Sequence, residues 1–318
     1  MEQPKEKPIS RAVTQEERDR LVLEIIGKMQ ANYVPGLDLV ITPQNVYQEA
    51  RRKGRAELEA FMDRLLLPGS RVDGLDHAEQ CLADLRAGRH VLFLPEHRGN
   101  FDVPSFNNLL RREGAAYEEI LDRLIYIAGR KLNESSETIK MFTEKYSRLV
   151  IVPRRDFPKE KPAETGEETR ERKEFEKYAA RINFAAFRLL IQLKNAGHIF
   201  VLYPLGGRLK PDADTLPVRE TASYLARFDR AYPISMEGNT LPPEERMEDE
   251  RPLPDKVIFR FGPPLDCKAF LAGEKARYKA QLSAGRLSGD MDYEQFTVNR
   301  IMEMLENLRL KGNYGNPA

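Results

Sequence analysis

The sequence predicts an α/β protein in which a mixed, mostly parallel sheet is covered by helices and follows a small N-terminal helical domain. From about residue 76, short apolar runs alternate with amphipathic stretches, which is the pattern of βαβ units. The first 75 residues instead show helical periodicity. At roughly 150 residues per domain, a chain of 318 residues exceeds one minimal domain. We therefore expect a helical domain over residues 1–75 and an α/β domain over residues 76–318.

The N-terminal segment carries clear helix signals. Thr14 is followed three residues later by Glu17, a capping box in which each side chain satisfies the backbone amide of the other residue. Apolar residues then recur at helical spacing from Leu21 to Met29. A second helix is predicted to begin at Thr42, because proline is tolerated in a first turn, and to end before Pro68.

Six apolar runs are the predicted strands, which is an ordinary number for one sheet. They are residues 90–94, 124–128, 149–152, 199–203, 231–235 and 257–261. A closing helix is predicted over residues 293–310, where apolar residues recur on one side. Two charge-dense segments, residues 154–177 and 244–256, are predicted to be mostly solvated.

Composition excludes several classes of protein. Lys and Arg number 51 against 50 for Asp and Glu, so the net charge of +1 argues against a nucleic-acid binder. Any site that binds an anion must therefore be formed by a local group of basic residues. Two cysteines, Cys81 and Cys267, cannot build a disulfide framework, which fits a reducing cytosol. No apolar run approaches the 18 residues that indicate a membrane-spanning helix. The charged N-terminus lacks the apolar region of a secretory signal. A cytoplasmic protein is expected.

A histidine and an aspartate follow the predicted strand at residues 90–94. Ligands bind at the carboxyl ends of strands in open α/β sheets, so His97 and Asp102 lie where a site is expected. They can meet only if His97 lies on the loop and Asp102 on the turn into the next helix, with Gly99 supplying the bend. Asp102 would then hold one imidazole nitrogen while the other takes a proton from an alcohol. Alternatively, Asp102 is only a helix N-cap and His97 a polar loop residue.

The strand at residues 199–203 leads into a glycine-rich, basic segment. The backbone amides of Gly206 and Gly207 could approach an anion, and Arg208 and Lys210 bring cationic donors to the same edge. The alternative is a strand-terminating turn with two exposed cations.

The strand at residues 149–152 leads into Arg154 and Arg155. Adjacent residues of an extended chain point to opposite sides, so one of the two arginines is expected in the shared cleft. The other could pair with Asp156.

Together these residues describe a base held by a carboxylate beside a cationic pocket. The sequence shows no reactive cysteine, serine elbow or metal set, and His77 with Cys81 supplies only two of the ligands a zinc site needs. Such an arrangement suits activation of a hydroxyl on a phosphorylated small molecule for direct attack on an activated acyl group. We expect no cofactor and no metal.

Four sequence blocks carry a family resemblance: the H-x-x-x-x-D block at residues 96–102, and residues 149–154, 204–208 and 232–236. In this order they resemble the blocks of the glycerolipid acyltransferases, which include glycerol-3-phosphate and lysophosphatidate acyltransferases. The resemblance covers about residues 90–265. Within the family, residues 125–129, 154–155 and 206–212 look most like the soluble glycerol-3-phosphate acyltransferase of chloroplast type.

The resemblance implies a fold, a reaction and a set of site residues. The fold would be a helical bundle before an α/β domain with a mixed sheet. The reaction would move an acyl chain from an acyl carrier protein or coenzyme A thioester to the sn-1 hydroxyl of glycerol 3-phosphate in phospholipid synthesis. It implies that His97 is the general base, that Asp102 orients it, and that the glycerol phosphate ligands are Arg154, Arg155, Arg208 and Lys210.

The sequence departs from the family pattern in three places. One is that Arg154, Arg155 and Lys210 stand where the family has basic residues of other kinds, which keeps the charge but changes the donor geometry. Glu96 stands where many members have asparagine, and Leu205 stands where lysophosphatidate acyltransferases usually have glutamate, which argues against that enzyme. The alternatives are a lysophosphatidate or other lysolipid acyltransferase, and a catalytically degenerate module that binds acyl lipids.

A product that belongs in a membrane implies transient contact with a membrane surface, and the protein could be peripheral there. Four aromatic residues at helical intervals are expected in the core, in preference to lining an acyl groove. They are Phe175, Tyr178, Phe184 and Phe187.

Overall fold

A computed structural model describes residues 14–33, 40–134, 137–159, 165–208, 217–246, 249–287 and 291–311. Its strands are β1 (Tyr47–Gln48), β2 (Arg71–Asp73), β3 (Val91–Pro95), β4 (Leu124–Gly129), β5 (Arg148–Ile151), β6 (Ile199–Val201), β7 (Arg230–Glu237), β8 (Ile258–Phe261) and β9 (Leu265–Asp266). Its helices are α1 (Gln15–Ala31), α2 (Arg55–Leu65), α3 (Leu75–Arg86), α4 (Asp102–Arg112), α5 (Glu118–Arg123), α6 (Arg130–Glu134), α7 (Glu137–Thr143), α8 (Gly166–Asn195), α9 (Thr221–Leu225), α10 (Cys267–Ser283) and α11 (Tyr293–Lys311). Short 3₁₀ turns are η1 (Ala115–Tyr117) and η2 (Arg154–Asp156).

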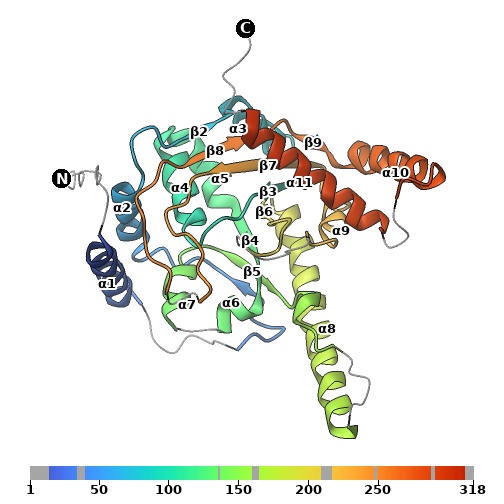
Figure 1. Cartoon of the computed structure of the whole chain (residues 1–318), viewed down its shortest axis with the longest axis horizontal. Coiled ribbons are helices and arrows are strands. Elements are labelled where there is room, and N and C mark those ends of the chain that lie inside the picture. The colour runs from blue at the N-terminus through green and yellow to red at the C-terminus, as the bar shows by residue number, and fades with distance from the viewer. Residues whose placement is uncertain are drawn as a thin grey trace.

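The described strands form one mixed sheet in the order β1-β5-β4-β6-β3-β7-β8-β2, with β9 paired to β7. Figure 1 shows helices packed around this sheet. Pairing is parallel from β5 through to β7 and between β8 and β2, and it is antiparallel for β1, for β9 and between β7 and β8. The predicted fold class, a mostly parallel mixed sheet covered by helices, is confirmed.

The strand β3 lies at the centre of the sheet. Its Leu92 is the register partner of Phe200 in β6 and of Ala231 in β7. All five residues of β3 are buried, as expected for a strand covered on both faces. Because β3, β4 and β6 run parallel, their carboxyl ends meet at one edge of the sheet.

Alternate residues of β3 enter two different cores. Val91 and Phe93 pack in a cluster with residues of α1, α2, α3 and α4. Leu92 and Leu94 pack in a cluster with residues of α8 and α11. This division follows from the two-residue period of a strand, and it gives the sheet one layer of helices on each face.

All six predicted strands are present, as β3 to β8. The helix predicted to begin at Thr42 is wrong in its first part, because Tyr47 and Gln48 form β1 beside β5 and α2 begins only at Arg55. The Val46 carbonyl accepts a hydrogen bond from the Val150 amide at 2.8 Å, so sheet pairing overrides the helical spacing there. The short strands β1, β2 and β9 give no apolar run in the sequence.

The N-terminal residues contribute to the sheet as well as forming helices. The predicted capping box is present: Thr14 Oγ1 accepts from the Glu17 amide at 3.2 Å, and Glu17 Oε2 accepts from the Thr14 amide at 2.9 Å. β1 pairs with β5 and β2 pairs with β8. The division into domains at residue 75 stays a prediction.

The helix α8 is 30 residues long and begins with a second capping box, between Thr165 and Glu168. Figure 1 shows one end of α8 extending beyond the rest of the fold. Phe175 and Tyr178 pack against the core as predicted. Phe184 and Phe187 do not, since they are 63% and 39% exposed, and their predicted core position is wrong.

The closing helix agrees with prediction, as α11. Within the described ranges, none of the helices is both long enough and apolar enough to cross a bilayer.

Candidate active site

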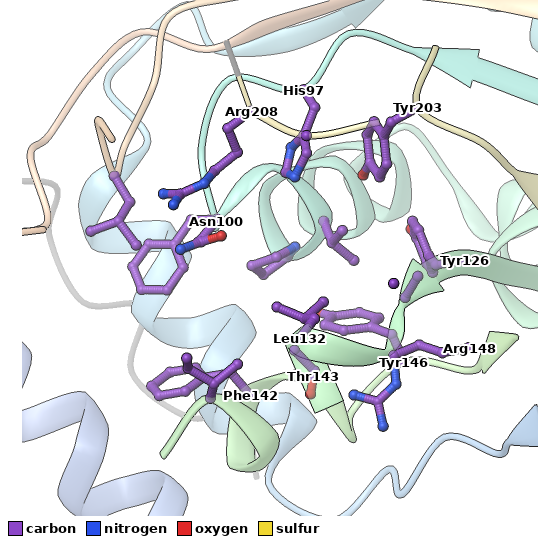
Figure 2. Close-up of a pocket in the computed structure, with 18 of the residues that line it drawn as sticks. His97, Asn100, Tyr126, Leu132, Phe142, Thr143, Tyr146, Arg148, Tyr203 and Arg208 are labelled. Atoms are coloured by element: carbon purple, nitrogen blue, oxygen red, sulfur yellow. The ribbon is translucent and has the colours of Figure 1, made fainter. Parts of the chain in front are cut away.

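A cavity of about 470 Å³ lies at the carboxyl ends of β3, β4 and β6. This is the edge of the sheet where α/β proteins bind ligands, and the volume is in the usual range for small-molecule sites, about 300–1,000 Å³. Its walls are formed by the segments after those strands and by α1, α4, α6 and α7. Figure 2 shows His97 and Arg208 at one end, with Phe142, Thr143 and Arg148 at the other.

His97 and Asp102 are in contact, as the sequence predicts. β3 ends at Pro95, His97 lies on the following loop, and Asp102 is the first residue of α4. His97 Nδ1 lies 2.9 Å from Asp102 Oδ2. The Asp102 carboxylate is 2% exposed and also accepts hydrogen bonds from the amides of Arg98 (2.6 Å) and Gly99 (2.9 Å). These donors fix the carboxylate, which in turn holds Nδ1 and leaves Nε2 for a ligand.

The loop that carries His97 is hydrogen-bonded to the end of β7 and to the segment that follows it. Asn239 Nδ2 donates to the Arg98 carbonyl at 2.7 Å, and the Arg98 guanidinium donates to the Met236 carbonyl at 3.0 Å. Gly99 lies so close to this segment that a Cβ would be 2.6 Å from the Leu241 carbonyl oxygen. This close approach therefore requires glycine at residue 99.

Tyr203, at the end of β6, stacks on the His97 ring with 4.2 Å between ring centroids and 24° between planes. Burial, with Tyr126 and Asp102 nearby, raises the pKa of Tyr203 well above 10. A neutral ring on one face of His97 and the Asp102 carboxylate at Nδ1 together define the orientation of the imidazole.

Two of the predicted cations line the cavity on the side of His97. Arg155 donates to the Gly206 carbonyl, which brings η2 and the turn after β6 together. Arg208 is 11% exposed and pairs with Glu250, whose side chain is only 2% exposed. Both guanidinium groups are in the wall, with His97, of one cavity.

Glu250 also accepts a hydrogen bond from Asn100, another residue that lines the cavity. Its Oε2 accepts from Asn100 Nδ2 at 2.9 Å while Oε1 accepts from Arg208. The carboxylate therefore links the His97 loop to the turn after β6. The sequence shows Glu250 only as one acid in a charge-dense segment.

The structure does not bring every predicted cation to the cavity. The Arg154 side chain is 74% exposed and its Nε lies 3.5 Å from Glu220 Oε1, away from the cavity. The expected pairing of an arginine with Asp156 is wrong, because Lys131 takes that carboxylate at 2.9 Å. The two arginines diverge as predicted, although they lie on a 3₁₀ turn and not on an extended strand.

The glycines after β6 serve the turn itself. The Gly206 amide donates to the Tyr203 carbonyl at 2.8 Å, so it is already engaged within the turn. A Cβ on Gly206, whose φ is +65°, would lie 2.2 Å from Val218 Cγ2. Gly207 lies against the Arg155 guanidinium. Lys210 lies outside the described residues.

The other end of the cavity is mostly apolar. α1 and α7 provide much of it, and α2, α4 and α6 add further residues. The apolar lining residues at this end include Val22, Ile25, Ile26, Leu58, Leu132, Ile139 and Phe142. One cavity thus joins a cationic end beside His97 to a mostly apolar part, at whose far end the buried Arg148 also lies.

Glu96, which departs from the family pattern, points away from the cavity. Its Oε2 accepts from the Met236 amide at 2.8 Å, and Arg309 of α11 approaches Oε1 at 3.5 Å. Burial raises the pKa of Glu96 above its ordinary value of 4.5, with the Met236 amide and the arginines opposing that shift. Glu96 thus ties β3 to β7 and α11.

Sequence reasoning found the residues that are close to one another in the chain and missed those that are remote. Glu250, Asn239 and Tyr203 have no local pattern that marks them. Only the placement of Tyr203 at the end of a predicted strand could have indicated that it lies near His97. Among the described residues, no group of three or more His, Cys, Asp or Glu could hold a metal ion.

No protein-family model matches the chain, and no curated protein matches it. Among solved structures, the chain is similar to the 1-acyl-sn-glycerophosphate (LPA) acyltransferase PlsC from Thermotoga maritima. The TM-score is 0.43 at 16% sequence identity, over 92% of this chain and 98% of that one.

Proposed function

We propose that the protein is an O-acyltransferase that moves a fatty acyl chain from an acyl carrier protein or coenzyme A thioester to the sn-1 hydroxyl of glycerol 3-phosphate. The observation that carries the proposal is the His97–Asp102 pair at the cationic end of a cavity that continues into a mostly apolar part. An acyl donor and a phosphorylated acceptor need these two environments, with a base between them.

In this reaction His97 Nε2 takes the proton of the acceptor hydroxyl as that oxygen attacks the thioester carbonyl carbon. A carbon–oxygen bond forms, and the negative charge moves to the carbonyl oxygen. When the tetrahedral intermediate collapses, the carbon–sulfur bond breaks and the thiolate receives the proton from His97. Asp102 keeps Nδ1 protonated and stabilises the imidazolium between the two transfers.

The cationic end suits the phosphate of the acceptor. Arg155 and Arg208 each carry a guanidinium group that can donate two parallel hydrogen bonds to two oxygens of one phosphate. Lys210 and Arg154 are the further ligands that the family resemblance implies. The apolar end, beneath α1 and beside α7, suits the acyl chain.

The test is release of free thiol by the purified protein from an acyl thioester in the presence of glycerol 3-phosphate. We expect His97→Ala to slow release by about 10²–10⁴-fold, the usual contribution of a general base. His90→Ala is the matched control, because His90 Nδ1 also lies 2.9 Å from an aspartate, Asp229, but at the other end of β3. Equal rates of thiol release for His97→Ala and the wild type would contradict this mechanism.

The acceptor and the donor are decided by the same assay run side by side. As acceptors, glycerol 3-phosphate is compared with lysophosphatidate. As donors, acyl thioesters of acyl carrier protein are compared with those of coenzyme A. A strong preference for lysophosphatidate would replace the sn-1 assignment with the lysolipid alternative. Turnover above the buffer rate with either acceptor would eliminate a degenerate binding module.

A further inference from the structure

The outer face of α8 is not used by the proposed reaction. At 1.5 Å per residue, α8 is about 45 Å long. Its inner face is buried against the sheet through Ala179, Ile182, Ala186 and Leu190. Figure 1 shows that one half of the helix projects beyond the other elements, so much of its outer face has no neighbouring helix.

One exposed stripe runs along this outer face. At 100° per residue, ten of the positions from Arg170 to Asn195 fall within an arc of about 120° centred on Phe184, opposite the buried residues. All ten are exposed. They are Arg170, Lys173, Lys177, Ala180, Arg181, Phe184, Phe187, Arg188, Ile191 and Asn195.

The stripe combines cations with apolar side chains and contains no acid. Five of its ten residues are Lys or Arg, and three are large apolar residues, Phe184, Phe187 and Ile191, which are 63%, 39% and 37% exposed. The nearest acids on the helix, Glu174 and Glu176, lie about 20° beyond the two edges of the arc. Glu174 pairs with Arg170 at 3.0 Å. In a chain with a net charge of +1, this is a local concentration of positive charge.

The cationic and aromatic surface continues beyond α8. The Arg227 guanidinium lies over the Phe187 ring at 4.9 Å from its centroid. Lys194 lies over the Phe228 ring at 5.9 Å and donates to the Arg227 carbonyl at 2.7 Å. Arg227 therefore adds a further exposed cation beside the apolar end of the stripe.

We propose that this stripe docks on the surface of an anionic phospholipid bilayer, with the apolar side chains in the interfacial region and the cations on lipid phosphates. Exposed aromatic residues flanked by Lys and Arg on one helix face are the composition of helices that lie in a membrane interface. From Arg170 to Ile191 the stripe is straight over about 32 Å, which a planar surface can contact along its whole length. This surface is separate from the cavity, and the proposal does not rest on the proposed function.

Two other occupants are less compatible with the stripe. A second copy of the chain, packed through the same stripe, would bring cations close to cations, because the stripe itself contains no acid and the neighbouring Glu174 already pairs with Arg170 of its own helix. An acidic protein would match the charge of the stripe. However, three large apolar side chains in a row require a partner that is apolar as well as anionic. A bilayer interface offers both properties along its entire surface.

The first test is sedimentation with vesicles. We expect the wild-type protein to sediment with vesicles that contain phosphatidylglycerol, to remain in solution with phosphatidylcholine vesicles, and to be released by salt. The double variant Lys173→Glu/Lys177→Glu should bind the anionic vesicles at least about tenfold more weakly. Lys275→Glu/Lys279→Glu on α10 is the matched control, because it changes two exposed lysines four residues apart by the same charge.

A second measurement reports contact directly. The chain contains no tryptophan, so Phe184→Trp introduces a single tryptophan, which can be excited selectively, at the centre of the stripe. Its emission should shift to shorter wavelength when anionic vesicles are added, because the ring leaves water. Circular dichroism confirms that each variant is folded.

Three results would overturn the proposal. The first is that wild-type protein stays in solution with anionic vesicles, or that the α8 and α10 variants bind them equally well. The second is that the Phe184→Trp protein responds to polyglutamate and not to vesicles, which would assign the stripe to an acidic protein partner. The third is a dimer that dissociates in the α8 variant and shows no vesicle binding, which would assign it to a second copy.

Discussion

Glu250 is the residue on which two parts of the candidate site depend. It is buried with Arg208 and accepts hydrogen bonds from both Arg208 and Asn100. Removing one partner of a buried ion pair leaves an uncompensated charge, which costs about 3–5 kcal/mol. We therefore expect Glu250→Ala to lower the free energy of unfolding by an amount in this range, measured by urea denaturation.

Glu174→Ala is the control for that measurement. The Arg170–Glu174 pair has the same chemistry, but its side chains are 81% and 63% exposed, so its loss should change stability by less than about 1 kcal/mol. Added inorganic phosphate should recover part of the loss in the Glu250→Ala protein, because an anion can replace the carboxylate beside Arg208. Equal effects of the two substitutions would contradict the buried-pair interpretation.

Glu96 makes stability depend on pH in a defined direction. Burial raises its pKa in the folded protein above 4.5, so folding favours the protonated form. The stability that Glu96 contributes is then complete below about pH 4.5 and is lost as pH rises through the folded pKa. Glu96→Gln keeps an acceptor for the Met236 amide without the charge.

We therefore expect the Glu96→Gln protein to gain stability relative to the wild type as pH rises above about 4.5. The measurement is urea denaturation of both proteins at a series of pH values. A difference in unfolding free energy that stays constant across the series would show that Glu96 does not titrate with the raised pKa.

The parts of the site that could be predicted from sequence are those set by local geometry. His97 and Asp102 are five residues apart, and a strand end followed by a helix start leaves few ways to arrange them. Glu250 is 150 residues from Asn100, and nothing in either local segment indicates the other. Such contacts follow from the strand order of the sheet, which hydrophobic patterning does not specify.

At the scale of elements, the strongest local signals were the most reliable. The capping box at Thr14 predicts the start of α1, and the buried apolar runs predict β3 to β8. The segment from Thr42 is predicted as helix because proline is tolerated in a first turn, yet β1 pairs with β5 there. Phe184 and Phe187 show the same limit, since periodicity identifies a helix face but not whether another element covers it.

The position of α7 leads to a prediction about acyl-chain length. Thr143 is the last residue of α7, and Figure 2 shows it at the end of the cavity away from His97. Under the proposed function the acyl chain occupies this apolar end. Thr143→Phe would fill space there, so the longest acyl thioester that is turned over should become shorter.

The measurement is thiol release over a series of donor chain lengths. Short donors provide the internal control, because they do not reach Thr143 and should keep the wild-type rate. A uniform fall in rate at every chain length would instead indicate general damage to the fold. An unchanged series would place the acyl chain elsewhere.

At the scale of the whole molecule, the first 75 residues and the remainder share one sheet and both of its cores. β2 forms the edge beside β8, β1 pairs with β5, and the Phe61 ring of α2 contacts the Phe101 ring at 6.1 Å between centroids. Phe61 is fully buried, and residues of α1 and α2 close the apolar end of the cavity. A chain that begins at residue 76 would expose these surfaces.

We therefore expect residues 76–318, expressed alone, to unfold at a lower urea concentration than the full chain and to lack the cooperative transition of the intact protein. Large buried side chains cost about 2–5 kcal/mol each when their partners are removed, and several are affected at once. Adding residues 1–75 as a separate peptide should restore part of the transition, because the lost contacts are noncovalent. The contradicting result would be that residues 76–318 unfold at the same midpoint urea concentration as the full chain. The boundary at residue 75 would then separate two domains that fold independently, and the shared sheet would contribute little to stability.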